Sequence, residues 1–381
     1  QYIDAGADII ETCSFNSNAI SLEEYGIADK VTELNLAAAR LARNVADGAT
    51  RPVWVAGSIG PTGKSLTMAI NLGDSITFDE MEQAYYDQVK ALVEGGVDLL
   101  LFETIFDTLN VKAGLHAAFR VMDDLNVNVP IITSVTLTES GRTLSGQSLE
   151  AFVASVSHAG QLAFSLNCGF GPESMVPFIE SLDYVPAAIA MYPNAGLPNK
   201  MGEYDQSPAD MGRAIEPLLA SRRLNIVGGC CGTTPAHIAE LARLASRYEP
   251  RPIPCHKNIT TLAGLDPLAI IPGNNLVNIG ERCNVAGSRK FLRLINEGAI
   301  DEAVDIAAAQ VAKGAQAVDI NMDDGMLDSM KCMDSFVARL QVEPDVARVP
   351  MVIDSSKWEV ILAGLKRVQG KPLVNDISLK E

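Results

Sequence analysis

Long apolar stretches and basic residues are both scarce in this sequence of 381 residues. No apolar run reaches the roughly 18 residues that a membrane-spanning helix needs. The 30 Lys and Arg residues stand against 47 Asp and Glu residues, a formal charge of −17. Such an acidic surface repels phosphate backbones and anionic lipids, so we expect neither a nucleic-acid partner nor a membrane partner.

Cysteine is also infrequent, and the chain has an odd number of cysteines, seven. A framework of disulfides is therefore a poor explanation for them. Free thiols persist in a reducing compartment, where they commonly bind metals or act in catalysis. We accordingly predict a cytoplasmic protein. The hydrophobic content of 48% with 20% charged residues is that of an ordinary folded protein.

Short β-rich segments alternate with amphipathic helical segments along the first 249 residues, which predicts repeated βα units. One predicted helix, Lys30–Asp47, carries an apolar stripe of Val31, Leu34, Ala38, Leu41 and Val45. The predicted strands are Asp8–Thr12, Pro52–Ser58, Asp98–Thr104, Pro130–Thr136, Leu162–Asn167, Ala187–Met191 and Asn225–Gly229.

Seven strands are one fewer than a (β/α)₈ barrel contains, and Gln1 begins a segment that is typical of a helix end. We therefore expect an α/β fold whose first domain (1–249) is a TIM-type barrel without its N-terminal βα unit. An open doubly wound sheet is the alternative, although no G-x-G-x-x-G motif follows a strand to support it.

Five prolines fall between Pro250 and Pro272, and since they disfavour both helix and strand, we expect a linker over 250–274. A second run of βα units follows over 275–381, which predicts the first half of a second TIM-type barrel in tandem with the first, truncated at its C-terminus. The predicted strands there are Asn275–Gly280, Ala317–Asn321, Pro350–Asp354 and Pro372–Ile377, and the predicted helices include Asp301–Lys313 and Lys357–Val368.

Three cysteines follow predicted strands of the first barrel. Cys168 ends one strand, and the adjacent pair Cys230 and Cys231 lies between glycines at the end of the last strand. The flanking glycines permit a sharp turn that would bring both sulfurs of the pair to one ion. Three thiolates with one open position are typical of catalytic zinc. The alternative is that each is a buried apolar cysteine.

Several long motifs of this chain resemble those of the cobalamin-dependent methionine synthases, and the resemblance extends along essentially the whole chain. In the first domain they are Gly57–Thr62, Phe102–Thr108, Ser140–Gly146, Tyr192–Asn199 and Gly228–Thr234, and in the second they are Gly280–Asn284, Asp319–Asp323 and Ile353–Lys357. The chain departs from the family pattern at Cys13, Cys283 and Asp376.

The resemblance implies a homocysteine-binding zinc barrel followed by a pterin-binding barrel. Zinc would be held by Cys168, Cys230 and Cys231, and homocysteine would bind the open position as a thiolate. That thiolate would take the methyl group of methylcobalamin, giving methionine. 5-methyltetrahydrofolate on the second barrel would then remethylate the cobalamin. A cobalamin-binding domain of the same full-length protein is the implied partner, so we do not expect this stretch alone to complete the turnover.

The resemblance also suggests contacts for the two substrates. Glu103, and less directly Glu11, are candidates for the homocysteine ammonium, because a carboxylate at the barrel rim suits a cation. Structural ion pairs are the alternative for both. The candidate pterin contacts are Asp354 and Asn375, which end successive strands, with Asn284, Asp319 and Asn321 as neighbours at the rim. For the last three, capping or turn roles are equally open. For His237, which follows the cysteine pair, we favour a capping or surface role.

Two alternatives to this function stay open. One is a cobalamin-independent homocysteine S-methyltransferase that takes its methyl group from betaine or S-methylmethionine. The start of a pterin barrel argues against it, because such an enzyme would need no pterin site. The other is a non-catalytic zinc-binding barrel, against which the cysteine trio and the rim carboxylates argue.

Overall fold

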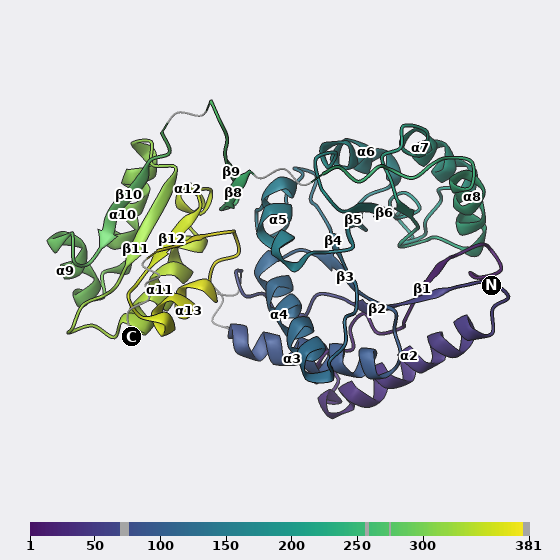
Figure 1. Cartoon of the computed structure of the whole chain (residues 1–381), viewed down its shortest axis with the longest axis horizontal. Helices are drawn as coiled ribbons and strands as arrows, with labels where there is room; N and C mark the ends of the chain where they lie inside the picture. Colours follow the sequence, from purple (N-terminus) through teal and green to yellow (C-terminus); the bar gives the residue numbers. More distant parts are fainter. Residues whose placement is uncertain (69–75, 256–258, 274–275, 376–381) are drawn as a thin grey trace.

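The computed structural model describes residues 1–68, 76–255, 259–273 and 276–375 of the chain. Its first module is a curled sheet of seven parallel strands in the sequential order β1 to β7, enclosed by helices (Figure 1). This arrangement confirms the predicted α/β barrel architecture. The strands are β1 (Ile9–Glu11), β2 (Trp54–Ile59), β3 (Leu99–Ile105), β4 (Ile131–Val135), β5 (Ala163–Asn167), β6 (Ala188–Tyr192) and β7 (Ile226–Val227).

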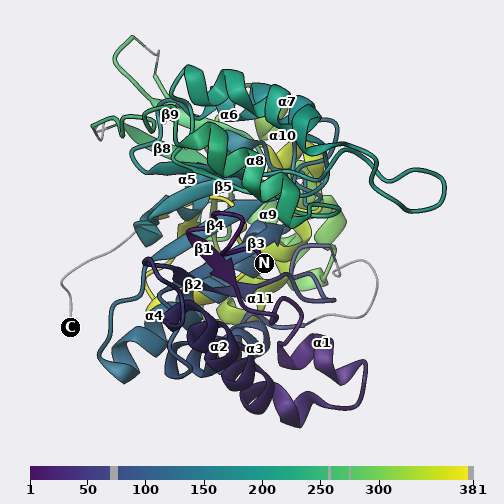
Figure 2. The same ribbon diagram turned by 90° about the vertical axis from the view of Figure 1, so that its right-hand side faces the viewer.

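Helices cover the outer face of this sheet, as the view turned by 90° makes clear (Figure 2). A capping box opens one of them: the Thr77 hydroxyl accepts from the Glu80 N–H, and the Glu80 carboxylate accepts from the Thr77 N–H. The helices are α1 (Ala19–Glu23), α2 (Val31–Asp47), α3 (Phe78–Glu94), α4 (Thr108–Leu125), α5 (Leu149–Val156), α6 (Pro172–Ser181), α7 (Pro208–Ala220) and α8 (Pro235–Ala245).

Side chains along each strand point alternately to the two faces of the sheet, and this separates two apolar layers. Inward-facing residues such as Leu101, Ile132 and Ala188 pack together inside the curled sheet. Their neighbours in the chain, among them Leu100 and Ile131, pack outward against the helices. Within the described residues, no helix is both long enough and apolar enough to span a membrane.

Helix α2 packs on the sheet by a different face from the one its apolar stripe predicted. Its buried residues include Ala39, Ala42 and Ala46, whereas Leu41 and Val45 are 65% and 53% exposed. The small residues face inward because the helix lies close to the end of α3, where a side chain on Gly95 would collide with Ala39. Size, rather than hydrophobicity, therefore decides which face of α2 is buried.

The segment predicted as a linker contains an antiparallel hairpin of β8 (Thr260–Ala263) and β9 (Pro267–Ile270). Pro267 is tolerated because it is the first residue of its strand, where its missing N–H matters least. The hairpin packs against α5, and the Gln147 side chain donates to the Gly264 carbonyl at 2.7 Å. The expectation that the prolines exclude strand from this segment was therefore wrong for these eight residues.

The second module is a four-stranded parallel sheet in the order β10 to β13, with helices around it. Its first strand starts later than the predicted Asn275–Gly280. The strands are β10 (Ile279–Asn284), β11 (Ala317–Asn321), β12 (Met351–Asp354) and β13 (Leu373–Asn375), and the helices are α9 (Arg289–Glu297), α10 (Ile300–Ala312), α11 (Ser329–Gln341), α12 (Pro344–Ala347) and α13 (Trp358–Leu365). Together with the first module, it supports two barrel-type domains in tandem.

The two modules touch through side chains that reach the backbone of the partner module. Lys112 on α4 donates to the carbonyls of Val368 and Gly370 beyond α13. Nearby, the Gln369 side chain donates to the Ser145 carbonyl. These contacts join α4 and the loop before α5 in the first module to the segment after α13 in the second.

Candidate metal centre and substrate sites

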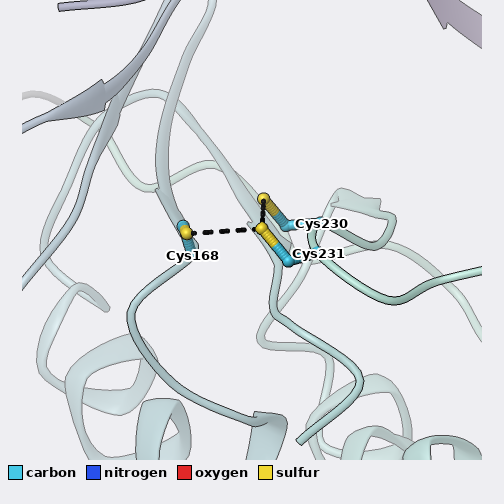
Figure 3. A group of neighbouring side chains, drawn as sticks. All are labelled: Cys168, Cys230 and Cys231. Atoms are coloured by element: carbon cyan, nitrogen blue, oxygen red, sulfur yellow. Dashed lines mark hydrogen bonds between the residues drawn. The ribbon is translucent and has the colours of Figure 1, made fainter. Parts of the chain in front are cut away.

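The predicted cysteine trio comes together at the carboxyl ends of β5 and β7. The sulfur of Cys231 lies 3.9 Å from that of Cys168 and 3.9 Å from that of Cys230. All three sulfurs lie within 4.8 Å of one another, and no other metal-ligand group of this kind occurs among the described residues. Figure 3 shows the three side chains converging on one point from two segments.

Local backbone geometry explains how the adjacent pair Cys230 and Cys231 can face one point. The Cys230 N–H donates to the Pro193 carbonyl, and the Cys231 N–H donates to the Asn194 side chain at 3.1 Å. Gly232 then takes a φ of +78°, which turns the chain sharply away from the strand. The turn that the flanking glycines predicted is therefore present.

The three thiols of the cluster differ in the direction of their pKa shifts. The hydrogen bond from Cys230 lowers the pKa of Cys168 to about 5, against a smaller opposing effect of burial. The hydrogen bond to Cys168 and then burial raise the pKa of Cys230, and burial followed by repulsion from Cys168 raises the pKa of Cys231. One thiolate held by two thiols is the arrangement expected of a cluster that can lose further protons to a cation.

The two carboxylates predicted for a substrate ammonium lie inside the same barrel mouth. Glu103 is 6% exposed, and its carboxylate accepts from the Ser58 hydroxyl at 2.5 Å. Burial raises the pKa of Glu103. Burial of its carboxylate and then repulsion from Glu103 raise the pKa of Glu11 to about 8, although the residue as a whole is exposed at the edge of the sheet. Neither carboxylate has a Lys or Arg partner among the ion pairs of the described residues, so the structural ion pairs considered as an alternative are not found in that part of the chain.

Several polar side chains of this mouth carried no predicted role. They occupy inward-facing positions toward the carboxyl ends of β2, β4, β5 and β6: Ser58, Ser134, Asn167 and Tyr192. Tyr192 is 8% exposed, and its hydroxyl faces the side chains of Glu103 and Ser134. Strand alternation could have identified them, because each lies an even number of residues from an inward-facing apolar residue of its own strand.

His237 caps its helix, as the sequence predicted, and does not join the cysteines. Its Nδ1 accepts from the Thr234 N–H at 3.2 Å, so Nε2 carries the proton and donates to the Gln206 carbonyl at 2.9 Å. The residue is buried rather than at the surface.

Four of the five predicted pterin contacts form one row across the second sheet. The pairing of neighbouring strands aligns Asn284 with Asn321, Asn321 with Asp354, and Asp354 with Asn375. The Asn321 amide donates to Asp354 at 2.9 Å, while Asn284 accepts two backbone N–H groups of the turn that follows it. Asn284 therefore also has the turn role that the sequence left open.

The fifth predicted contact, Asp319, lies deeper on β11 and is 5% exposed. Burial, followed by repulsion from Asp354 and Glu281, raises its pKa to about 7. Of the departures from the family pattern, Cys13 is exposed and Cys283 is buried, while Asp376 lies outside the described residues.

Fold and site together define an α/β-barrel protein with a three-thiol cluster at the carboxyl ends of its strands. The family model for homocysteine S-methyltransferase matches residues 1–245, and the model for pterin binding enzymes matches residues 280–381. The chain belongs to the homocysteine S-methyltransferase family. It is thus a methyltransferase with a homocysteine-binding module and a pterin-binding module.

One solved structure is similar in fold to this chain. The homocysteine methyltransferase MmuM from Escherichia coli, in its oxidized form, is similar with a TM-score of 0.51 and 23% sequence identity, over 64% of this chain and 81% of that chain. The metallated form of the same protein gives a TM-score of 0.47 at 23% identity, over 65% and 81% of the two chains. At this level of identity the likeness of the oxidized form supports the fold alone.

Proposed function

We propose that this chain provides the homocysteine and folate modules of a cobalamin-dependent methionine synthase. In this reaction the methyl group of 5-methyltetrahydrofolate reaches homocysteine by way of cobalamin, giving methionine and tetrahydrofolate. The observation that carries the proposal is the three-thiol cluster in the same chain as a pterin-binding module. A cobalamin-binding domain of the full-length protein is the proposed partner. The free cysteines suit a cytoplasmic location.

The cysteine trio fits zinc in both chemistry and spacing. Zinc–sulfur bonds of about 2.3 Å at tetrahedral angles separate the sulfurs by roughly 3.8 Å, and the two distances to Cys231 are 3.9 Å. Three protein sulfurs leave one tetrahedral position for a substrate. Zinc bound there would lower the pKa of the homocysteine thiol, so that it reacts as a thiolate at neutral pH.

Glu103 and Glu11 are proposed to hold the ammonium group of homocysteine. Two neighbouring carboxylates with raised pKa values favour a cation between them, because the cation relieves both the burial cost and the mutual repulsion. Ser58 keeps Glu103 in place by donating to one of its oxygens. This contact would fix the substrate at its charged end while the sulfur faces the cysteines.

The row Asn284, Asn321, Asp354 and Asn375 is proposed to contact the pterin ring, with Asp319 beneath it. A pterin edge presents both donors and acceptors, which match a carboxylate beside amides. The hydrogen bond from Asn321 holds the Asp354 carboxylate in the row, beside the amides. Amide side chains on both sides of Asp354 would supply the complementary donors.

The two half-reactions test this proposal separately. The chain is given homocysteine and free methylcobalamin, and methionine is measured for wild type, Cys230→Ser and the control Cys332→Ser. We expect at least a 100-fold loss in Cys230→Ser and wild-type activity in the control. Methionine formed from methyltetrahydrofolate without cobalamin, or from S-methylmethionine, would contradict the proposal in favour of the cobalamin-independent reaction. No methionine from any donor, with no bound zinc, would contradict both.

A further inference from the structure

The buried side chain of Asn167, the last residue of β5, contacts three segments of the barrel mouth. Its Oδ1 accepts from the Thr104 N–H at 2.9 Å and from the Ser134 hydroxyl at 2.6 Å. Its Nδ2 donates to the Thr104 hydroxyl at 2.8 Å and lies 4.0 Å from the sulfur of Cys230. One amide thus joins β3, β4 and the turn after β7, and it directly precedes Cys168.

The orientation of this amide follows from its partners. The Thr104 N–H can only donate, so the Asn167 oxygen must face it. The nitrogen then has one hydrogen for the Thr104 hydroxyl and one directed toward Cys230. A thiolate sulfur accepts such a hydrogen, whereas an oxygen in the same place would repel it.

Two strained residues flank the same amide. Thr104 has a φ of +55° and Cys168 a φ of +57°, both in the left-handed region that is unfavourable for side chains other than glycine. At Thr104 the pairing of β3 with β4 also shifts register between Phe102 and Ile105. Such strain persists only where surrounding contacts hold it. Asn167 holds Thr104 at both its N–H and its hydroxyl, and so fixes the bulge that presents Glu103.

We propose that Asn167 is a positioning residue that couples the sulfur of Cys230 to the bulge carrying Glu103. The inference rests on the proposed zinc centre and deepens it. The N–H directed at Cys230 would stabilise that sulfur as a metal ligand, and the paired contacts to Thr104 would fix the distance between the metal and the carboxylate. Partners that orient metal ligands typically change metal affinity by about 10- to 100-fold when they are lost.

Cobalt(II) substitution tests this role without any substrate, because the sulfur-to-cobalt charge-transfer band reports the hydrogen bonding of the thiolates. Asn167→Leu removes the N–H near Cys230, which raises the energy of the sulfur lone pair, so we expect the band to move to longer wavelength. We also expect zinc affinity, measured by competition with a chromophoric chelator, to fall by about 10- to 100-fold. Both readouts use the full chain with cobalt or zinc alone.

Two further variants separate positioning from general stability. Asn167→Asp keeps the oxygen that accepts from Thr104 and Ser134, so it should preserve the bulge even if Asn167→Leu fails to fold. Because it lacks the N–H near Cys230, it should still shift the band. Asn35→Leu is the matched control, because Asn35 is equally buried but donates only to the carbonyls of Ser17 and Val31. It should lower the melting temperature and leave the band unchanged.

The outcomes distinguish this role from the proposed function. If wild type binds cobalt and folded Asn167 variants keep its band and its zinc affinity, the role of Asn167 is overturned while the zinc centre stands. An equal band shift in Asn35→Leu would also overturn it. If wild type binds neither cobalt nor zinc, the proposed function fails, and the role of Asn167 fails with it.

Discussion

Cys168 and Cys231 are 63 residues apart in the chain, yet their sulfur atoms lie 3.9 Å apart. Each follows a parallel strand, and parallel strands bring their carboxyl ends to one rim of a barrel. The strand order of the first sheet therefore assembles the three-thiol cluster, and folding and metal binding should depend on each other.

Zinc should stabilise this chain through the cysteine trio. Ligand binding to the folded state at 100 times its dissociation constant adds about 2.7 kcal/mol, so we expect zinc to raise the melting temperature of the chelator-treated protein by several degrees. Cys168→Ser should abolish most of this increase. Cys332→Ser, on α11 of the second module, should retain it. Differential scanning fluorimetry measures this increase. If zinc raises the melting temperature of Cys168→Ser as much as that of wild type, the trio is not the site.

Glu11 should make stability depend on pH. Because its pKa is raised from 4.5 to about 8, the folded protein keeps a proton that the unfolded chain has already released in this range. The stabilisation is complete below about pH 4.5 and is lost as the pH rises toward 8. Glu11→Gln should flatten the decline of the melting temperature between pH 5 and pH 8. The surface variant Glu94→Gln should follow wild type, and the same decline in Glu11→Gln would refute the assignment.

Homocysteine should reverse this pH effect if its ammonium binds between the carboxylates. A cation beside Glu103 and Glu11 favours their ionised forms, so binding should release protons near pH 7. Isothermal titration in buffers of different ionisation enthalpy measures this release on the zinc-loaded chain. Glu103→Gln should weaken binding by at least 10-fold, since it removes a buried carboxylate from a charged hydrogen bond. Equal affinity in Glu103→Gln would place the ammonium elsewhere.

Asp354→Ala should affect the pterin site alone. The substitution removes the carboxylate at the centre of the polar row and leaves the Asn321 amide without its acceptor. We expect the affinity for methyltetrahydrofolate, measured by fluorescence, to fall by at least 10-fold. The zinc content should be unchanged. Asp305→Ala, at an exposed position of α10, is the control. Loss of zinc in Asp354→Ala would count against separate sites for the two substrates.

Lys112 should hold the two modules together. Its ammonium donates to the carbonyls of Val368 and Gly370, and Lys112→Met would leave both acceptors without this partner. The expected cost is about 1–3 kcal/mol, concentrated at the contact between the modules. Calorimetry should then resolve separate transitions where wild type shows closer coupling. Lys331→Met, an exposed change on α11, should behave as wild type; a single unaltered transition in Lys112→Met would contradict the role.

The parts of the structure that local patterns encode were predictable from the sequence. Short β-rich segments between helical ones located all seven strands of the first sheet, and β11 matched Ala317–Asn321 in full. Size complementarity between α2 and α3 involves two separate segments, so the stripe containing Leu41 misidentified the buried face. The start of β10 was placed too early, because Asn275–Gly280 and Ile279–Asn284 are both compatible with a short strand.

The candidate site likewise contains residues that the sequence could predict and residues that it could not. The cysteine trio was predictable because thiols at strand ends are rare and chemically distinctive. Strand alternation places Asn167 inside the barrel, but its role was not predictable, because its contacts with Thr104, Ser134 and Cys230 depend on the register of strands distant in the chain. The bulge at Thr104 likewise has no local sequence signal.

X-ray absorption at the zinc edge tests the central claim most directly. For the zinc-loaded chain we predict three sulfur neighbours at about 2.3 Å and one lighter ligand. Addition of homocysteine should replace the lighter ligand with a fourth sulfur. A zinc shell dominated by nitrogen or oxygen, or a shell that homocysteine leaves unchanged, would contradict the account.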